Sequence, residues 1–271
     1  NTAVGYRAGR NITKGRYNTV VGYNAFDSAT ELDKNTAIGY AALTSMSGSA
    51  GETQNTAVGY YAGGAITTGT DNTIVGSIAG DAINTGVSNT LMGTQAGSAI
   101  NSGGYNTIIG RRAGQAITTG GYNTALGSSA LYTNQTGAGN VGIGQGAGYT
   151  MTAGGGIFIG YEAGYNIASA DTVLIGYTAG KYLVGTGNTM MGYGAGVGAS
   201  TTAANNTGTY NTGVGTYALR WMSKTIGSTA FGAEAGYYTT GSYNTFMGYK
   251  AGHGGTTSAP YSSGQYNTAL G

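Results

Sequence analysis

The sequence predicts an all-β protein, a parallel β-solenoid of about 16 coils with 16–17 residues in each coil. Three observations predict this fold. One short motif recurs along the whole chain, a large apolar residue holds one fixed place in the motif, and glycines return at fixed places between copies. Self-similarity at a fixed period is typical of repeat architectures, in which a single unit cannot bury its apolar side chains but a stack of units can.

The motif reads Asn-Thr-small-aliphatic-Gly-Tyr-x-Ala-Gly, and a turn-rich segment leads to the next Asn. We number its positions from the Asn, so that the glycine after the aliphatic residue is position five. Most steps between these glycines are 16 or 17 residues, one is 20 and two are 23. Position five stands at Gly5, Gly22, Gly39, Gly59, Gly76, Gly93, Gly110, Gly127, Gly144, Gly160, Gly176, Gly192, Gly215, Gly232, Gly248 and Gly271.

The copies cover the chain without a gap. We therefore predict one solenoid domain over residues 1–271, with lengthened loops near 43–54, 197–210 and 253–266. The insertions fall at one phase of the repeat, so these loops are expected to leave the same edge, which is often the binding face of a repeat array. The chain starts and stops inside a copy, and we expect it to be a stretch of a longer periodic molecule.

Positions two to four predict a short strand in every coil. Position four is always large and apolar, and position two exchanges Thr for Val141, Ile157 and Val173. Because side chains alternate between the two faces of a strand, we expect positions two and four to face the interior together. Position eight is Ala in every copy that reaches it, position twelve is often Ile, and the glycines at positions five, nine and fifteen predict corners.

Asn stands at position one in thirteen of the sixteen copies. In a stack with every coil in register, these amides can hydrogen bond to one another along the axis, as Asn ladders do in fibrils. We therefore interpret the Asn as a structural ladder rather than as a ligand site.

Position three is predicted to point outward, because it lies between two inward positions, yet it is apolar in most copies. A stripe of that length in water would exceed the apolar patches that monomers expose. We therefore expect a homotrimer in which position three is buried between identical chains. The predicted oligomer interface consists of Val20, Ile74, Leu91, Ile108, Phe158, Leu174, Met190 and Phe246.

Composition argues against several function classes. The chain has 55 Gly in 271 residues, 7% charged residues, a net charge of +2 and no Cys. Such a weak charge gives no field to steer nucleic acid, and no apolar run approaches the roughly 18 residues that membrane insertion needs. The one histidine, His253, has no acidic neighbour in sequence, and carboxylates do not recur at one phase. We expect no catalysis, no metal and no cofactor.

Tyrosine is abundant, with 23 residues, and most often follows position five or precedes the Asn. In register, these rings would form partial ladders that either stiffen the solenoid or bind sugars and surfaces. The segment ALRWMSK adds Arg220 and the only Trp close to the second long loop. The candidate ligand-binding surface consists of Tyr6, Tyr23, Tyr40, Tyr60, Tyr161, Tyr177, Tyr193, Trp221, Tyr249 and Tyr261.

The copies NTAVGYRAG, NTAIGYAAL and NTAVGYYAG resemble the repeats of phage tail-fibre and related extracellular fibre proteins. They are more distantly similar to the shorter repeats in the heads of trimeric autotransporter adhesins. The resemblance implies a left-handed β-roll, a homotrimer and a location outside a cell or on a virion surface. The repeat length and the frequent Tyr after position five depart from those heads, and the resemblance carries over no active residue.

We expect a structural or adhesive fibre segment without catalysis, such as the shaft or receptor-binding head of a phage tail fibre or a cell-surface adhesin. Its partners would be identical chains and a host-surface glycan or protein receptor. Three alternatives stay open at this point. They are a self-assembling extracellular filament subunit, a polysaccharide-cleaving tailspike with two carboxylates in a groove, and an ice-binding solenoid that uses the row of Thr residues at position two.

Overall fold

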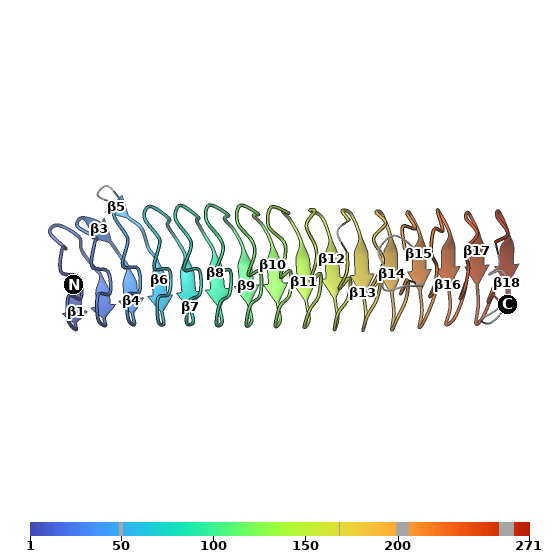
Figure 1. Cartoon of the computed structure of the whole chain (residues 1–271), viewed down its shortest axis with the longest axis horizontal. Coiled ribbons are helices and arrows are strands. Elements are labelled where there is room, and N and C mark those ends of the chain that lie inside the picture. Colours follow the sequence, from blue (N-terminus) through green and yellow to red (C-terminus); the bar gives the residue numbers. More distant parts are fainter. Residues whose placement is uncertain (49–50, 168, 199–205, 255–262) are drawn as a thin grey trace. The chain divides into compact units, whose positions relative to one another are not determined.

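The computed structural model describes residues 1–48, 51–167, 169–198, 206–254 and 263–271 (Figure 1). These residues form short strands joined by turns and bends, and no helix occurs among them. The chain divides into two compact units, Asn1–Gly139 and Asn140–Gly271, and each unit is a parallel β-solenoid. The predicted fold class is therefore confirmed, while the oligomeric state stays a prediction.

The first unit places one strand of every coil in a single parallel sheet. Neighbouring strands pair without slippage, so that Thr73 lies beside Thr90 and Ile74 lies beside Leu91. A second, two-stranded parallel sheet joins β3 (Leu32–Asp33) to β5 (Gly51–Glu52). The main strands are β1 (Thr2–Val4), β2 (Thr19–Val21), β4 (Thr36–Ile38), β6 (Thr56–Val58), β7 (Thr73–Val75), β8 (Thr90–Met92), β9 (Thr107–Ile109) and β10 (Thr124–Leu126).

The second unit repeats this arrangement, with parallel pairs in the same register, as in Phe158 beside Leu174. Its strands are β11 (Val141–Ile143), β12 (Ile157–Ile159), β13 (Val173–Ile175), β14 (Thr189–Met191), β15 (Thr212–Val214), β16 (Thr229–Phe231), β17 (Thr245–Met247) and β18 (Thr268–Leu270). Eight strands enclose seven complete turns in each unit, so the two units hold about fourteen turns, slightly fewer than the predicted 16 coils.

The faces of the strands are the reverse of the predicted ones. Position three points inward, and every residue predicted for the oligomer interface is buried inside its own chain, with at most 5% of any of them exposed. These side chains cannot form a contact between chains, because the single chain already covers them. The residues concerned are Val20, Ile74, Leu91, Ile108, Phe158, Leu174, Met190 and Phe246.

Position three packs against position nine, and the two positions share a limited volume. Where position three is large, position nine of the preceding coil is Gly, and a Cβ built on Gly80 would lie only 2.7 Å from Leu91 Cδ1 in the next coil. Where position nine is large and buried, position three of the following coil is small, as in Leu43 before Ala57. Protein interiors are close-packed, so an increase at one position requires a decrease at the other. The buried Ala of position eight and Ile of position twelve complete this core, as predicted.

The predicted Asn ladder is confirmed. The backbone N–H of Asn106 donates to Oδ1 of Asn89 (3.1 Å), and Nδ2 of Asn106 donates to the same oxygen (3.0 Å) and to the carbonyl of Gly120 (3.0 Å). Where position one is not Asn, the pattern adapts, since the N–H of Gly156 still donates to Oδ1 of Asn140 (2.8 Å). The ladder thus satisfies buried polar groups that would otherwise be costly.

Candidate functional site

The outward face of the sheet carries two rows of side chains from successive coils, mostly Thr at position two and a large apolar residue at position four. Position four was predicted to be buried, but eight of these residues are between 37% and 74% exposed. Neither row contains a charged residue. These exposed residues are Val4, Ile38, Met92, Leu126, Met191, Phe231, Met247 and Leu270.

Tyrosine ladders border this face. In the first unit, the rings of Tyr6, Tyr23, Tyr40 and Tyr60 follow one another, with centroids 5.1, 5.3 and 5.2 Å apart. All four are exposed, and their hydroxyl-bearing edges reach solvent. A shorter stack on the other border joins Tyr105 to Tyr122 at 5.0 Å.

The second unit has its own ladder, in which Tyr161, Tyr177 and Tyr193 stack at 5.0 and 5.1 Å. Tyr249 lies beside the ammonium of Lys250, 5.1 Å from the ring centroid to Nζ. The predicted partial ladders are therefore present as geometry. Tyr261 and most of the two long loops, residues 199–205 and 255–262, lie outside the described residues.

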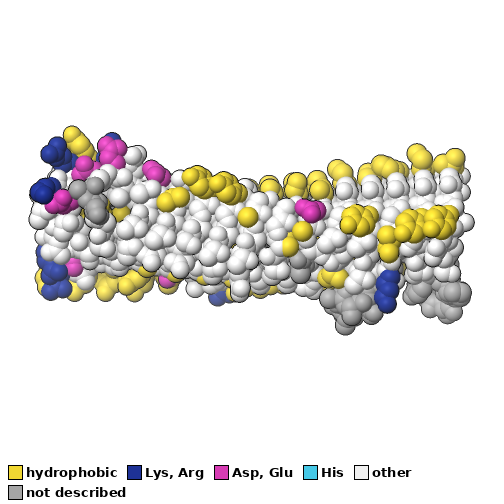
Figure 2. All heavy atoms as spheres, turned by 90° about the horizontal axis from the view of Figure 1, so that it is seen from above, with side chains coloured by type: hydrophobic (Ala, Val, Ile, Leu, Met, Phe, Trp, Pro, Cys, Tyr) yellow, Lys and Arg dark blue, Asp and Glu magenta, His cyan; other side chains and the backbone are white. Residues whose placement is uncertain are grey.

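Charged side chains gather mostly over the first coils of the first unit, whereas hydrophobic side chains follow the surface in rows (Figure 2). Asp27 pairs with Arg10 (Oδ1 to Nε, 3.0 Å), and Glu31 pairs with Lys14 (2.7 Å). Lys34 reaches Glu52 (2.6 Å) in the following coil. These are exposed pairs between neighbouring coils, and they contribute little to stability individually.

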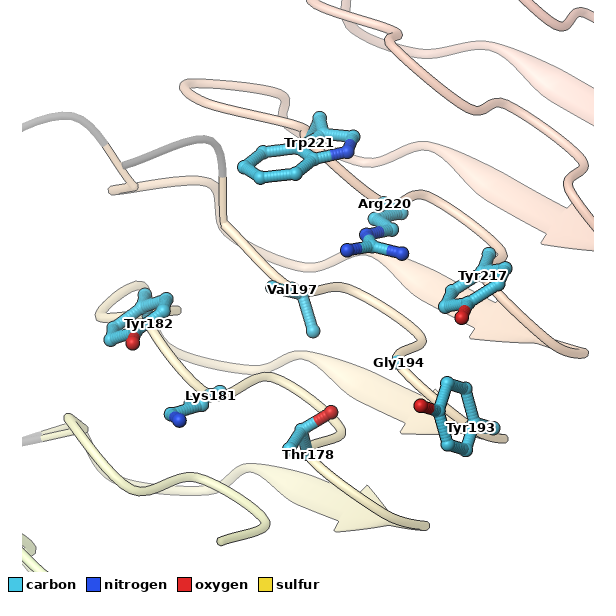
Figure 3. Close-up of a pocket in the computed structure, with 9 residues that line it drawn as sticks. All are labelled: Thr178, Lys181, Tyr182, Tyr193, Gly194, Val197, Tyr217, Arg220 and Trp221. Atoms are coloured by element: carbon cyan, nitrogen blue, oxygen red, sulfur yellow. The ribbon is translucent and has the colours of Figure 1, made fainter. Parts of the chain in front are cut away.

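A pocket of about 220 Å³ opens on the lateral surface of the second unit. Figure 3 shows that three successive coils line it, those that begin with β13, β14 and β15. Its lining contains no carboxylate, and the lining residues are Thr178, Lys181, Tyr182, Tyr193, Gly194, Val197, Tyr217, Arg220 and Trp221.

One glycine helps to explain the shape of this part of the surface. The middle coil has Gly194 at position seven, where the next coil has Tyr217. The Tyr217 ring leans over Gly194, because a Cβ built there would lie 2.7 Å from two ring carbons. The recess therefore has the glycine backbone on one side and aromatic rings on the others.

Arg220 is the principal charge in this recess. Its Cζ lies 4.4 Å from the ring centroid of Tyr217 and 5.0 Å from that of Trp221, so the guanidinium stacks on two aromatic rings. Among the described residues, its buried Nε has no hydrogen-bond partner, and no carboxylate lies within ion-pair distance of Arg220. Trp221 is held in place by a hydrogen bond from Nε1 to the hydroxyl of Tyr237 (3.1 Å).

Lys181 is the second cation, but it is already neutralised by Glu162. A hydrogen bond with that carboxylate raises the pKa of Lys181 above its ordinary value. The pKa of Tyr193 is also raised, chiefly by its hydrogen bond with Tyr217, so this phenol stays protonated at neutral pH. The recess therefore offers one uncompensated positive charge, several hydroxyl groups and two aromatic surfaces.

The pocket contains only two of the residues that the sequence indicated for binding, Tyr193 and Trp221. The remaining predicted tyrosines that the structure describes lie in ladders or beside a lysine. Sequence reasoning missed Tyr182 and Tyr217 as partners of Trp221, because neither follows position five nor precedes the Asn. The signals that could have found them are the shared position eleven of Tyr182 and Trp221 and the glycine, Gly194, in the intervening coil.

Comparisons with family models, curated proteins and solved structures find no match to this chain. In the described ranges, no group of three or more His, Cys, Asp or Glu side chains is placed to hold a metal ion. Those ranges also contain no helix with the length and hydropathy to span a bilayer.

Proposed function

We propose that this chain is a structural and adhesive fibre segment without catalysis, the shaft or receptor-binding head of a phage tail fibre or a cell-surface adhesin. The observation that carries the proposal is the coil-by-coil stack with exposed tyrosine ladders along its sheet. Such a stack turns a short motif into an extended, regular surface, and weak contacts repeated along it add up to firm attachment. In this role the protein works outside a cell or on a virion surface.

The adhesive part of the proposal rests on the ladders of stacked tyrosines. Each ring presents an apolar edge and a hydroxyl group, a combination that contacts sugars and proteins at low entropic cost. Stacking fixes the rings before any ligand arrives, as with Tyr23 and Tyr40, whose planes differ by only 3°. A ligand therefore meets a preorganised surface.

The experiment measures binding of the purified chain to immobilised bacterial surface polysaccharides and to a glycan array. We expect binding that is weakened about tenfold or more when Tyr23→Ser and Tyr40→Ser are combined, because several stacked contacts are lost together. Tyr17→Ser is the matched control, since Tyr17 is exposed but belongs to no stack. Absence of binding to every glycan surface, or equal loss in the control, would contradict the adhesive role.

The homotrimer remains part of this proposal, although not through position three. If identical chains associate, we expect the exposed row of apolar residues at position four to be buried between them, because large exposed apolar stripes favour association. Sedimentation equilibrium tests this point. A trimer that Met92→Lys and Met191→Lys convert to a monomer supports it, and a monomeric parent chain contradicts it.

A second candidate function is binding to ice, and the outward row of Thr residues favours it. Strands are about 4.8 Å apart and side chains on one face about 6.6 Å apart, so positions two and four form a flat, uncharged lattice of methyl and hydroxyl groups. Such a lattice can order water. Measurable thermal hysteresis that Thr90→Lys abolishes and the lateral control Thr85→Lys preserves would support this function, and the absence of hysteresis would exclude it.

A further inference from the structure

We propose that the pocket around Arg220 binds a pyranose sugar that carries a carboxylate, as in the uronic or sialic acids of surface polysaccharides. This inference rests on the proposed adhesive function and assigns a ligand class to one site within it. Three properties of the pocket lead to it, namely an uncompensated cation, fixed aromatic walls and a small volume.

The cation is the first property. Arg220 stacks on Tyr217 and Trp221, which holds the guanidinium plane and leaves its N–H edge free. A planar guanidinium matches a carboxylate with two parallel hydrogen bonds, which are stronger than those between neutral groups.

The charge balance selects one carboxylate rather than a more highly charged group. Lys181 is paired with Glu162, so Arg220 contributes the only uncompensated charge of the pocket lining. A single carboxylate cancels that charge, whereas a phosphate dianion would leave an excess negative charge in a partly desolvated recess, which is unfavourable.

The aromatic walls are the reason why we propose a ligand with a sugar ring. Tyr182 and Trp221 come from the two outer coils, about 9.6 Å apart in the stacking direction, which is twice the strand spacing. Trp221 is fixed by its bond to Tyr237 and takes a positive φ of 63°, which is unusual for a bulky residue. The apolar face of a pyranose can lie on such a ring, while the hydroxyl of Thr178 is available to its polar groups.

The volume limits the ligand to one sugar unit. The pocket of about 220 Å³ is smaller than the roughly 300–1,000 Å³ typical of drug-sized ligands. We therefore expect it to recognise a single residue of a longer glycan, while the rest of the glycan extends over the lateral surface.

Trp221 is the only Trp of the chain, so its fluorescence reports on this pocket directly. The experiment titrates the purified chain with methyl glucuronide and the methyl glycoside of a sialic acid, and compares them with methyl glucoside and acetate. We expect a saturable change with at least one acidic glycoside and binding about tenfold tighter than that of the neutral glycoside. Acetate, which lacks the ring, should bind more weakly than the acidic glycoside.

The variants locate the effect. Arg220→Gln should remove the preference for the acidic glycoside, and Arg220→Lys, which keeps the charge but loses the planar fork, should retain part of it. Arg111→Gln removes an exposed Arg of the first unit and serves as the control that leaves the preference unchanged. Circular dichroism verifies that each variant folds.

Three results would overturn the inference. They are no response of Trp221 to either acidic glycoside, an acetate response as strong as that of the glycoside, and an unchanged preference in folded Arg220→Gln. The same results leave the adhesive function intact if folded Arg220→Gln still binds the polysaccharide surfaces as strongly as the parent chain. In that case only the proposed sugar site in the pocket is refuted. If surface binding is lost only in the variant that combines Tyr23→Ser and Tyr40→Ser, the tyrosine ladder and not the pocket is the binding surface.

Discussion

Oδ1 of Asn72 accepts two hydrogen bonds from Asn89 of the next coil, one from the backbone N–H (3.0 Å) and one from Nδ2 (3.0 Å). Both residues are fully buried. Nδ2 of Asn89 also donates to the carbonyl of Gly103 (2.9 Å), so each Asn links its own coil to its neighbours. The ladder is a chain of satisfied polar groups inside the solenoid, and it fixes the register of the coils.

The ladder predicts a large loss of stability when one Asn is removed. Asn89→Ala would leave the N–H of Asn106 and the carbonyl of Gly103 without these partners, at about 1–3 kcal/mol for each buried group, and Nδ2 of Asn106 would keep only the carbonyl of Gly120. We expect the free energy of unfolding in urea to fall by at least about 2 kcal/mol. Asn101→Ala, at an exposed position, should change it by no more than about 0.5 kcal/mol. Equal effects of the two substitutions would contradict the structural role of the ladder.

The glycine corners predict that Gly→Ala substitutions at different places differ in their cost to stability. Gly76 has a φ of +142°, and an added Cβ would lie 2.5 Å from the carbonyl oxygen of Gly93 in the next coil. Gly76→Ala therefore combines an unfavourable backbone conformation with a clash between coils, and we expect it to cost about 2 kcal/mol or more. At Gly48 the nearest atom would be 3.6 Å away, so Gly48→Ala should be neutral or slightly stabilising. Thermal unfolding of both variants checks this, and a stable Gly76→Ala would show that the coils are not stacked this closely.

Asp81 predicts a dependence of stability on pH. Burial raises the pKa of Asp81 above its ordinary value of 3.8, and its Oδ1 has no hydrogen-bond partner in the described part of the chain. The folded state therefore binds this proton more tightly than the unfolded state, so stability is fully present below the unfolded pKa and decreases as pH rises through the folded pKa.

Asp81→Asn should consequently raise the free energy of unfolding at pH 7 and leave it nearly unchanged at pH 3. Urea titrations at the two pH values measure the difference. Asp71→Asn, at an exposed position, is the comparison and should behave like the parent chain at both values. A destabilised Asp81→Asn at pH 7 would indicate that the ionised carboxylate has a favourable partner.

Much of the architecture could be predicted from local chemistry. The period, the Asn ladder, the glycine corners and the buried Ala of position eight follow from constraints that each coil imposes on its neighbours. These constraints act at single positions and are therefore visible in a one-dimensional pattern. The stacked tyrosines follow in the same way, because equal positions of successive coils must lie side by side.

The orientation of the strand was predicted wrongly, because positions two, three and four all tolerate apolar residues. The exchange of Thr with Val141 and Ile157 indicates only an uncharged environment, which an exposed flat sheet also provides. The deciding signal was the exchange of volume between positions three and nine. Gly80 precedes Leu91 of the next coil, whereas Leu131 precedes Gly142, and only two residues that share one core need to compensate in this way.

The pocket around Arg220 could not be predicted from the repeat, because it arises where the repeat is broken. Gly194 lacks the side chain that Tyr217 provides in the next coil, and the guanidinium occupies a place that Val197 and Tyr237 hold in neighbouring coils. Such a site depends on differences between coils rather than on their consensus. Its recognition needs the register of the coils, which the structure supplies.

The orientation of the strand is the central claim of this account, since both the core and the exposed face depend on it. The chain contains no Cys, so single substitutions Leu91→Cys and Met92→Cys can be labelled with a thiol reagent in the folded protein and in urea. Leu91 is fully buried and Met92 is 44% exposed, and the account predicts rapid labelling of Met92→Cys in the folded state and of Leu91→Cys only after unfolding. Rapid labelling of folded Leu91→Cys with protection of Met92→Cys would contradict it.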